Sequence, residues 1–131
     1  MQLIFRVYCA NARYGEVLKV VGNIQELGMW NPTHAFTLVT SPDKFPFWTG
    51  GLCVDRSYIN SWENIQFKYV LCDKDSVFWE SHLPNRIIEV KSGLVNLCHV
   101  FDDNIDLSGL DQRPSNSTEI ISQNKRQVPE R

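Results

Sequence analysis

The chain has 131 residues, of which 43% are hydrophobic and 21% are charged, and its net charge is −2. This length and balance are typical of a single globular domain, and the charge gives no electrostatic reason to expect nucleic acid or a membrane as a partner. No apolar run approaches the roughly 20 residues of a membrane helix, and Met1 leads directly into a strand pattern without a signal core. With Met1 as the native start, we expect a cytoplasmic protein.

The cysteines are far apart in the sequence, and each lies in or beside a strand-like segment. They are Cys9, Cys53, Cys72 and Cys98. No Cys-x-x-Cys pair indicates zinc or redox chemistry, so we expect buried core thiols. The even number leaves disulfides open.

The first half of the chain is a series of short apolar segments separated by turns. The expected strands are Gln2–Ala10, Glu16–Val21, Ala35–Val39 and Phe45–Val54. Between the second and third strands, Ile24–Leu27 is too short for a stable helix and predicts one helical turn or a tight loop that presents Met29 and Trp30. The Gly50-Gly51 pair predicts a bulge or a close backbone approach in the fourth strand.

The second half continues the same pattern. The expected strands are Asn64–Cys72, a short aromatic strand within Asp75–Arg86, Arg86–Val90 and Leu94–Asp102. Alternation along Asn64–Cys72 points Ile65, Phe67, Tyr69 and Leu71 one way and places Lys68 on the more polar face.

Seven to eight short strands without a helical pattern of useful length predict an all-β fold, an immunoglobulin-like antiparallel β-sandwich. We expect this domain to cover residues 1–102. From Asp103 onward polar residues dominate, which predicts that residues 103–131 are a disordered linker toward a downstream domain.

Motifs for catalysis or metal binding are not found in the sequence. His34, His82 and His99 have no partner at metal-ligand spacing, and Asp102-x-Asn104-x-Asp106 lacks the glycine of a calcium loop. Asn116-Ser117-Thr118 fits the glycosylation pattern by chance. We therefore expect a noncatalytic domain without a metal or a cofactor.

Aromatic residues at the ends of elements are the unusual feature of the chain. Three of the four tryptophans, Trp30, Trp62 and Trp79, lie at such ends or in polar loops. Each alone is equally compatible with a place in the core. Several together, among Asn, Glu and Lys, are typical of a sugar site, because an indole stacks on the C–H face of a pyranose while polar groups bond its hydroxyls.

A set of ordered motifs resembles the family-20 starch-binding module, from Gly15 to about Val90. These are Gly15-Glu16, Val21-Gly22-Asn23, Leu27-Gly28-Met29-Trp30-Asn31-Pro32, Phe47-Trp48, Phe67-Lys68-Tyr69, Phe78-Trp79-Glu80 and Pro84-Asn85-Arg86. The resemblance implies a noncatalytic β-sandwich that binds α-1,4-glucans such as starch, glycogen, amylopectin and maltooligosaccharides. It also implies a monomeric module, covalently linked to an enzyme such as an amylase, a glucan phosphatase, a glucan dikinase or a phosphodiesterase.

The same resemblance assigns roles to individual residues. Trp30 and Trp79 would form an angled aromatic platform, Lys68 and Asn85 would bond the sugar, and Glu80 would line the site. A second family site is less well matched, because Lys19 replaces a tyrosine there. Trp48 keeps its position, but a core role for it is favoured, so we expect one good site. The alternative is a module of the same fold whose exposed aromatics bind a protein partner.

Overall fold

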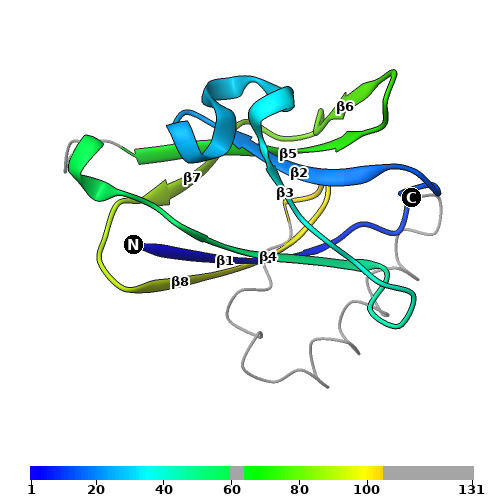
Figure 1. Cartoon of the computed structure of the whole chain (residues 1–131), viewed down its shortest axis with the longest axis horizontal. Helices are drawn as coiled ribbons and strands as arrows, with labels where there is room; N and C mark the ends of the chain where they lie inside the picture. The colour runs from blue at the N-terminus through cyan, green and yellow to red at the C-terminus, as the bar shows by residue number, and fades with distance from the viewer. Residues whose placement is uncertain (60–63, 105–131) are drawn as a thin grey trace.

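Two β-sheets packed face to face make up the part of the chain that the computed structural model describes, residues 1–59 and 64–104 (Figure 1). The strands are β1 (Gln2–Tyr8), β2 (Val17–Gly22), β3 (Phe36–Thr37), β4 (Phe47–Cys53), β5 (Asn64–Cys72), β6 (Val77–Trp79), β7 (Arg86–Glu89) and β8 (Leu94–Val100). The short 3-10 helices are η1 (Gln25–Trp30), η2 (Pro32–His34) and η3 (Arg56–Tyr58). The predicted β-sandwich is confirmed.

One sheet has three strands in the order β4-β1-β8. Strand β1 runs antiparallel to β4 but parallel to β8, with Gln2 opposite Leu94 and Tyr8 opposite Val100. The expectation of an antiparallel sandwich therefore needs one amendment, at this pair. Parallel neighbours need a long crossover, and here the crossover is almost the whole domain, because β1 and β8 lie at its two ends in the sequence.

The other sheet has five strands, and β5 is at its centre. One edge of β5 pairs with β2, whereas the other edge is shared between two short strands. Residues 64–67 of β5 pair with β7, and residues 70–72 pair with β6. Residues 68 and 69 therefore face the connection between β6 and β7, which begins at Glu80.

The core forms where alternating side chains of the two sheets meet. Leu3, Phe5 and Val7 of β1 are fully buried, and the ring of Phe5 contacts those of Phe67 and Tyr69 at centroid distances of 5.9 and 6.3 Å. The alternation predicted for β1 and β5 is thus confirmed, and it leaves the even-numbered residues of β5 on the outer face.

The paired glycines of β4 do not form a bulge, because β4 keeps a continuous register with β1 from Phe47 to Cys53. Gly50 instead lies against side chains of the β3 region. A Cβ atom at Gly50 would come within 2.9 Å of both Leu38 and Phe36. The neighbours of Gly50 therefore approach closely, as predicted, but the approaching atoms belong to side chains and not to another backbone segment.

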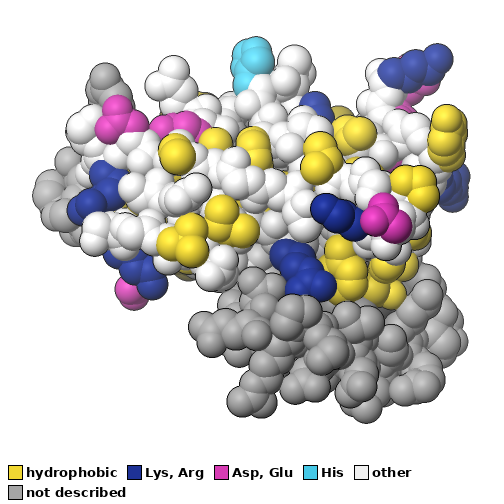
Figure 2. Space-filling view, turned by 60° about the horizontal axis from the view of Figure 1, so that its bottom comes forward, with side chains coloured by type: hydrophobic (Ala, Val, Ile, Leu, Met, Phe, Trp, Pro, Cys, Tyr) yellow, Lys and Arg dark blue, Asp and Glu magenta, His cyan; other side chains and the backbone are white. Residues whose placement is uncertain are grey.

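Lys, Arg, Asp and Glu side chains are interspersed on the face shown in Figure 2. The described residues include no helix that is long and apolar enough to cross a membrane. Cys9, Cys72 and Cys98 are buried, as expected, whereas Cys53 is exposed.

Candidate functional site

The outer face of the five-stranded sheet gathers most of the predicted site residues. Trp79 lies directly opposite Val70 across the β5–β6 pair, so both side chains share this face. Trp30 packs against the small cluster of Val21, Val70 and Cys72 on the same face. Both tryptophans therefore border the cluster of Val21, Val70 and Cys72, although 49 residues separate them in the sequence. Trp30 is half-buried and Trp79 is 39% exposed, so both keep indole surface for a ligand.

Trp30 reaches this position through an irregular turn. Gly28, Met29 and Trp30 all have positive φ, at 81°, 50° and 67°. Such angles are unfavourable for residues with a Cβ atom, and they are often found at functional sites. The turn is closed by hydrogen bonds from Asn31 N–H to Gly28 O (2.9 Å) and from Met29 N–H to Ile24 O (3.2 Å). The prediction of one helical turn or a tight loop is thus met by a kinked 3-10 segment, with non-helical angles at Leu27, Gly28 and Met29.

Gly28 gives a direct test of this turn. A Cβ atom there would lie 2.7 Å from the carbonyl carbon of His34 and 2.8 Å from its oxygen, in addition to the cost of the positive φ. We expect Gly28→Ala to lower the free energy of unfolding by about 2 kcal/mol or more in urea titrations. The control is Gly15→Ala, where φ is +90° but nothing lies within 4 Å of the new methyl group, so the loss should be about 1 kcal/mol. Equal losses for the two variants would contradict this account.

Lys68 stands on the outer face of β5, as predicted from the alternation. Its ammonium group donates to Glu80 O (2.9 Å) and Leu83 O (2.8 Å), two carbonyls of the β6–β7 connection. An ammonium group has three protons, so one donor is left for a ligand. Lys68 therefore holds the connection against the sheet and can still bond a sugar hydroxyl.

Asn85 is exposed at the end of the same connection. Its side-chain amide donates to Gln66 Oε1 at 3.2 Å, and Gln66 lies two residues before Lys68 on the outer face of β5. The structure thus brings Trp30, Lys68, Trp79 and Asn85 to one face of the sheet.

Glu80 lies on the opposite side and is only 2% exposed. Its carboxylate accepts from Tyr69 N–H (2.9 Å) and Asp102 N–H (2.8 Å), and it forms two hydrogen bonds with Arg86, at 2.6 and 3.0 Å. The expectation that Glu80 lines the sugar site therefore disagrees with its position. Strand alternation is the reason, because Trp79 points outward and its successor must point inward.

A second group of hydrogen bonds holds the β6–β7 connection in place, and the sequence did not predict it. Asp102 Oδ1 accepts from the backbone N–H groups of Ser81 (2.7 Å) and His82 (2.8 Å), and its Oδ2 accepts from His82 Nδ1 (2.6 Å). Partial burial alone would raise the pKa of Asp102, but these hydrogen bonds outweigh it and hold the pKa below its ordinary value. His82 and Asp102 are 20 residues apart, so no local motif could have paired them.

The lowered pKa of Asp102 predicts a dependence of stability on pH. A carboxyl group whose pKa is lower in the folded state stabilises the fold above its unfolded pKa, about 3.9, and loses this contribution as pH falls through the folded pKa. We expect Asp102→Asn to be less stable than the wild type at pH 6 and this difference to shrink below pH ~4. Urea unfolding at pH 6, 4 and 3 would show it. A difference that stays constant with pH would refute the prediction.

Trp48, the candidate for a second site, is 5% exposed, and its indole N–H donates to Cys9 O at 3.4 Å. This position supports the core role favoured above. Its edge also lines a hollow of about 400 Å³ together with the exposed Tyr14 and Phe45. Trp62 lies outside the described residues. Those residues contain no cluster of three His, Cys, Asp or Glu side chains that could hold a metal ion.

Comparison with known families agrees with this geometry. A family model described as "starch binding domain" matches residues 1–98. The chain belongs to the starch-binding domain family. This match covers all eight strands of the two sheets except the last residues of β8.

Other members of the starch-binding domain family are parts of larger enzymes. Glucoamylase-1 of Schizophyllum commune is 32% identical over 79 residues, which are 60% of this chain and 12% of that protein. The γ-CGTase of alkalophilic Bacillus clarkii superposes with a TM-score of 0.63 and 30% identity, over 76% of this chain and 15% of the other. This chain is thus a noncatalytic module that spans only a small fraction of these relatives.

An isolated starch-binding domain gives the same fold. The family 20 carbohydrate-binding module of the maltotetraose-forming amylase from Pseudomonas saccharophila STB07 superposes with a TM-score of 0.60. It is 23% identical, and the alignment covers 77% of this chain and 100% of that module. That module and this chain therefore share the β-sandwich fold.

Proposed function

We propose that this starch-binding domain binds α-1,4-glucan chains on the outer face of its five-stranded sheet. The observation that carries the proposal is that Trp30 and Trp79, distant in the sequence, both border the cluster of Val21, Val70 and Cys72 on this face. Two partly exposed indoles on one face offer apolar surface to the C–H faces of glucose units along one chain. Lys68 and Asn85, on the same face, supply donors for the hydroxyl groups.

The expected affinity of one such site is modest. If each indole covers about 100 Å² of sugar at ~25 cal/mol per Å², the gross gain is roughly 5 kcal/mol before ordering costs. This gain alone corresponds to a dissociation constant of roughly 0.2 mM. Hydrogen bonds from Lys68 and Asn85 add to it and ordering costs reduce it, so we expect dissociation constants on the order of micromolar to millimolar. Weak binding suits a module that is attached to an enzyme and acts on a polymer with many sites, because effective concentration then raises the overall affinity.

The surroundings of the module are a further part of the proposal. We place it next to a catalytic domain, with residues 103–131 as the linker, and consider starch, amylopectin or glycogen as its polymer. A cytoplasmic location is supported by the thiols of Cys53 and Cys72, since thiols persist in reducing compartments. The near-neutral charge and the interspersed charged side chains give no support to nucleic acid or membrane partners (Figure 2).

Isothermal titration with β-cyclodextrin, together with gel retardation by amylopectin, tests the proposal. We expect saturable binding with a dissociation constant in the range above. The competing function is a protein-binding module that uses the same exposed aromatics. Absence of glucan binding, combined with a stable oligomer in sedimentation, would favour that function and reject ours.

A further inference from the structure

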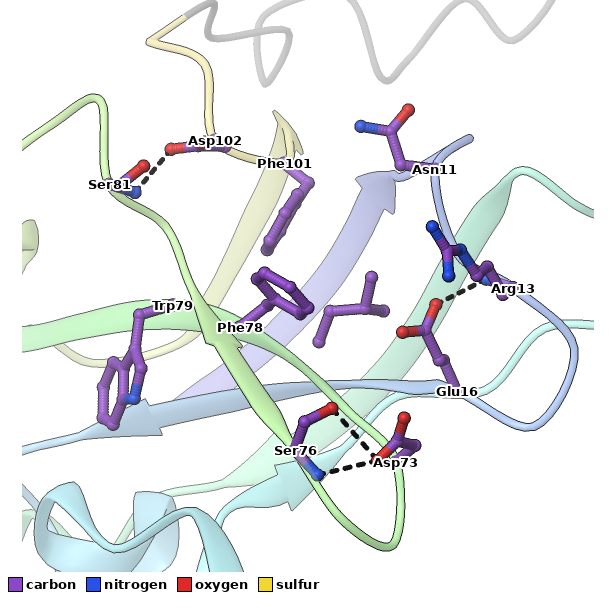
Figure 3. Close-up of a pocket in the computed structure, with 11 residues that line it drawn as sticks. Asn11, Arg13, Glu16, Asp73, Ser76, Phe78, Trp79, Ser81, Phe101 and Asp102 are labelled. Atoms are coloured by element: carbon purple, nitrogen blue, oxygen red, sulfur yellow. Dashed lines mark hydrogen bonds between the residues drawn. The ribbon is translucent and has the colours of Figure 1, made fainter.

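Strand β6 carries a second aromatic side chain that the site described above does not use. Phe78 precedes Trp79 and, because successive residues of a strand face opposite sides, it points away from the two tryptophans. Figure 3 shows the two rings on opposite sides of β6. Phe78 is 62% exposed, which is unusual for a phenylalanine on the core-facing side of a sheet.

The exposure has a simple geometric cause. Phe78 lies opposite Leu71 of β5, on the inner face, but β6 is the outermost strand of its sheet. Its inner face therefore opens into a groove of about 490 Å³, whose apolar part is formed by Leu71, Phe78 and Phe101. This volume lies within the range of sites that hold small ligands.

Polar side chains border the apolar part of this groove. Arg13 lines the groove, and its guanidinium has no hydrogen bond within the described residues. Asp73 lines the groove as well: its Oδ1 accepts from Asp75 N–H and Ser76 N–H, both at 2.7 Å, and from the Ser76 hydroxyl at 3.1 Å. These hydrogen bonds keep the pKa of Asp73 below its ordinary value, so it is an ionised acceptor at neutral pH. An aromatic face bordered by donors and acceptors is the chemistry that a pyranose requires.

We propose that this groove is an extension of the principal site, which receives the glucose units of a longer α-glucan after they pass over the edge of β6. The inference rests on the proposed function. Its main support is adjacency, because Trp79 is one of the residues that line the groove while its indole lies on the other side of β6, on the outer face of the sheet (Figure 3). Within the described residues β6 is an edge strand, so a bound chain that passes from one face to the other crosses the width of a single strand, roughly 5 Å.

The length of the oligosaccharide distinguishes binding at the tryptophan platform from binding in the groove. Maltotriose is short enough to occupy the tryptophan platform alone, whereas maltodecaose can reach the groove. We expect Phe78→Ala to leave the dissociation constant for maltotriose unchanged and to raise that for maltodecaose by roughly three- to tenfold in isothermal titrations. Trp79→Ala should weaken both ligands. The control is Leu94→Ala, an exposed apolar residue of the other sheet, which should change neither.

A second readout locates the contact. In ¹H–¹⁵N spectra, the side-chain amide of Asn11, which also lines the groove, should shift on addition of maltodecaose but not of maltotriose. The inference is overturned if Phe78→Ala binds maltodecaose as the wild type does, or if it weakens both ligands equally. Failure of the wild type to bind either sugar would instead reject the proposed function, and the extension with it.

Discussion

Replacing Trp79 with alanine is expected to raise the dissociation constant for β-cyclodextrin by roughly 50-fold. The variant loses about 100 Å² of apolar contact with the sugar, which at ~25 cal/mol per Å² is about 2.5 kcal/mol. The fold should tolerate the change, because Trp79 is 39% exposed and ends a three-residue edge strand. Isothermal titration gives the affinity, and thermal unfolding followed by circular dichroism gives the stability.

Two further variants sharpen this prediction. Trp79→Phe retains part of the aromatic surface, so its affinity should fall between those of the wild type and the alanine variant. Leu94→Ala removes exposed apolar surface of the other sheet and should bind normally. Unchanged binding by Trp79→Ala would show that the platform is not where the glucan binds, even if the domain binds glucan.

Replacing Arg86 with methionine is expected to lower the free energy of unfolding by about 3–5 kcal/mol. The Arg86 and Glu80 side chains are 9% and 0% exposed, and two hydrogen bonds join them. Methionine would fill much of the space but would leave the Glu80 carboxylate buried without its counter-ion, which is the costly outcome for a buried pair. It would also free the carbonyls of Val100 and Asp103, which accept from Arg86 at 3.1 and 3.0 Å.

Urea unfolding monitored by tryptophan fluorescence measures this loss. Arg56→Met, at an exposed position in η3, is the matched control and should change the stability by less than about 0.5 kcal/mol. A loss below about 1 kcal/mol for Arg86→Met would mean that the buried pair does not hold the β6–β7 connection. In that case the placement of Trp79 and Asn85 would need another explanation.

Alternation of apolar residues was enough to predict the sandwich and its core. Phe5 and Phe67 are buried because each lies on the apolar face of a clearly alternating strand. The parallel pairing of β1 with β8 was not predictable in the same way, because a single strand pattern does not show the direction of its neighbour. Side-chain periodicity is the same in both arrangements.

The candidate site was predictable where it depended on residue type and family resemblance, and less so where it depended on local geometry. Trp30, Lys68, Trp79 and Asn85 do reach one face of the sheet. Glu80 does not, because it is buried. Strand alternation could have predicted this, since the residue that follows an outward-facing Trp79 faces inward. The contact between His82 and Asp102 depends on the positive φ of Asp102, 57°, and on a return of the chain after β8 that no short motif encodes.

The indole resonances of the tryptophans provide the most direct test of the central claim, that glucan binds across Trp30 and Trp79. In a ¹H–¹⁵N titration with β-cyclodextrin, we expect the indole N–H signals of Trp30 and Trp79 to shift together, with one dissociation constant. The signal of Trp48, which is buried and donates to Cys9 O, should stay in place. Shifts of Trp48 without those of Trp30 and Trp79 would contradict the account.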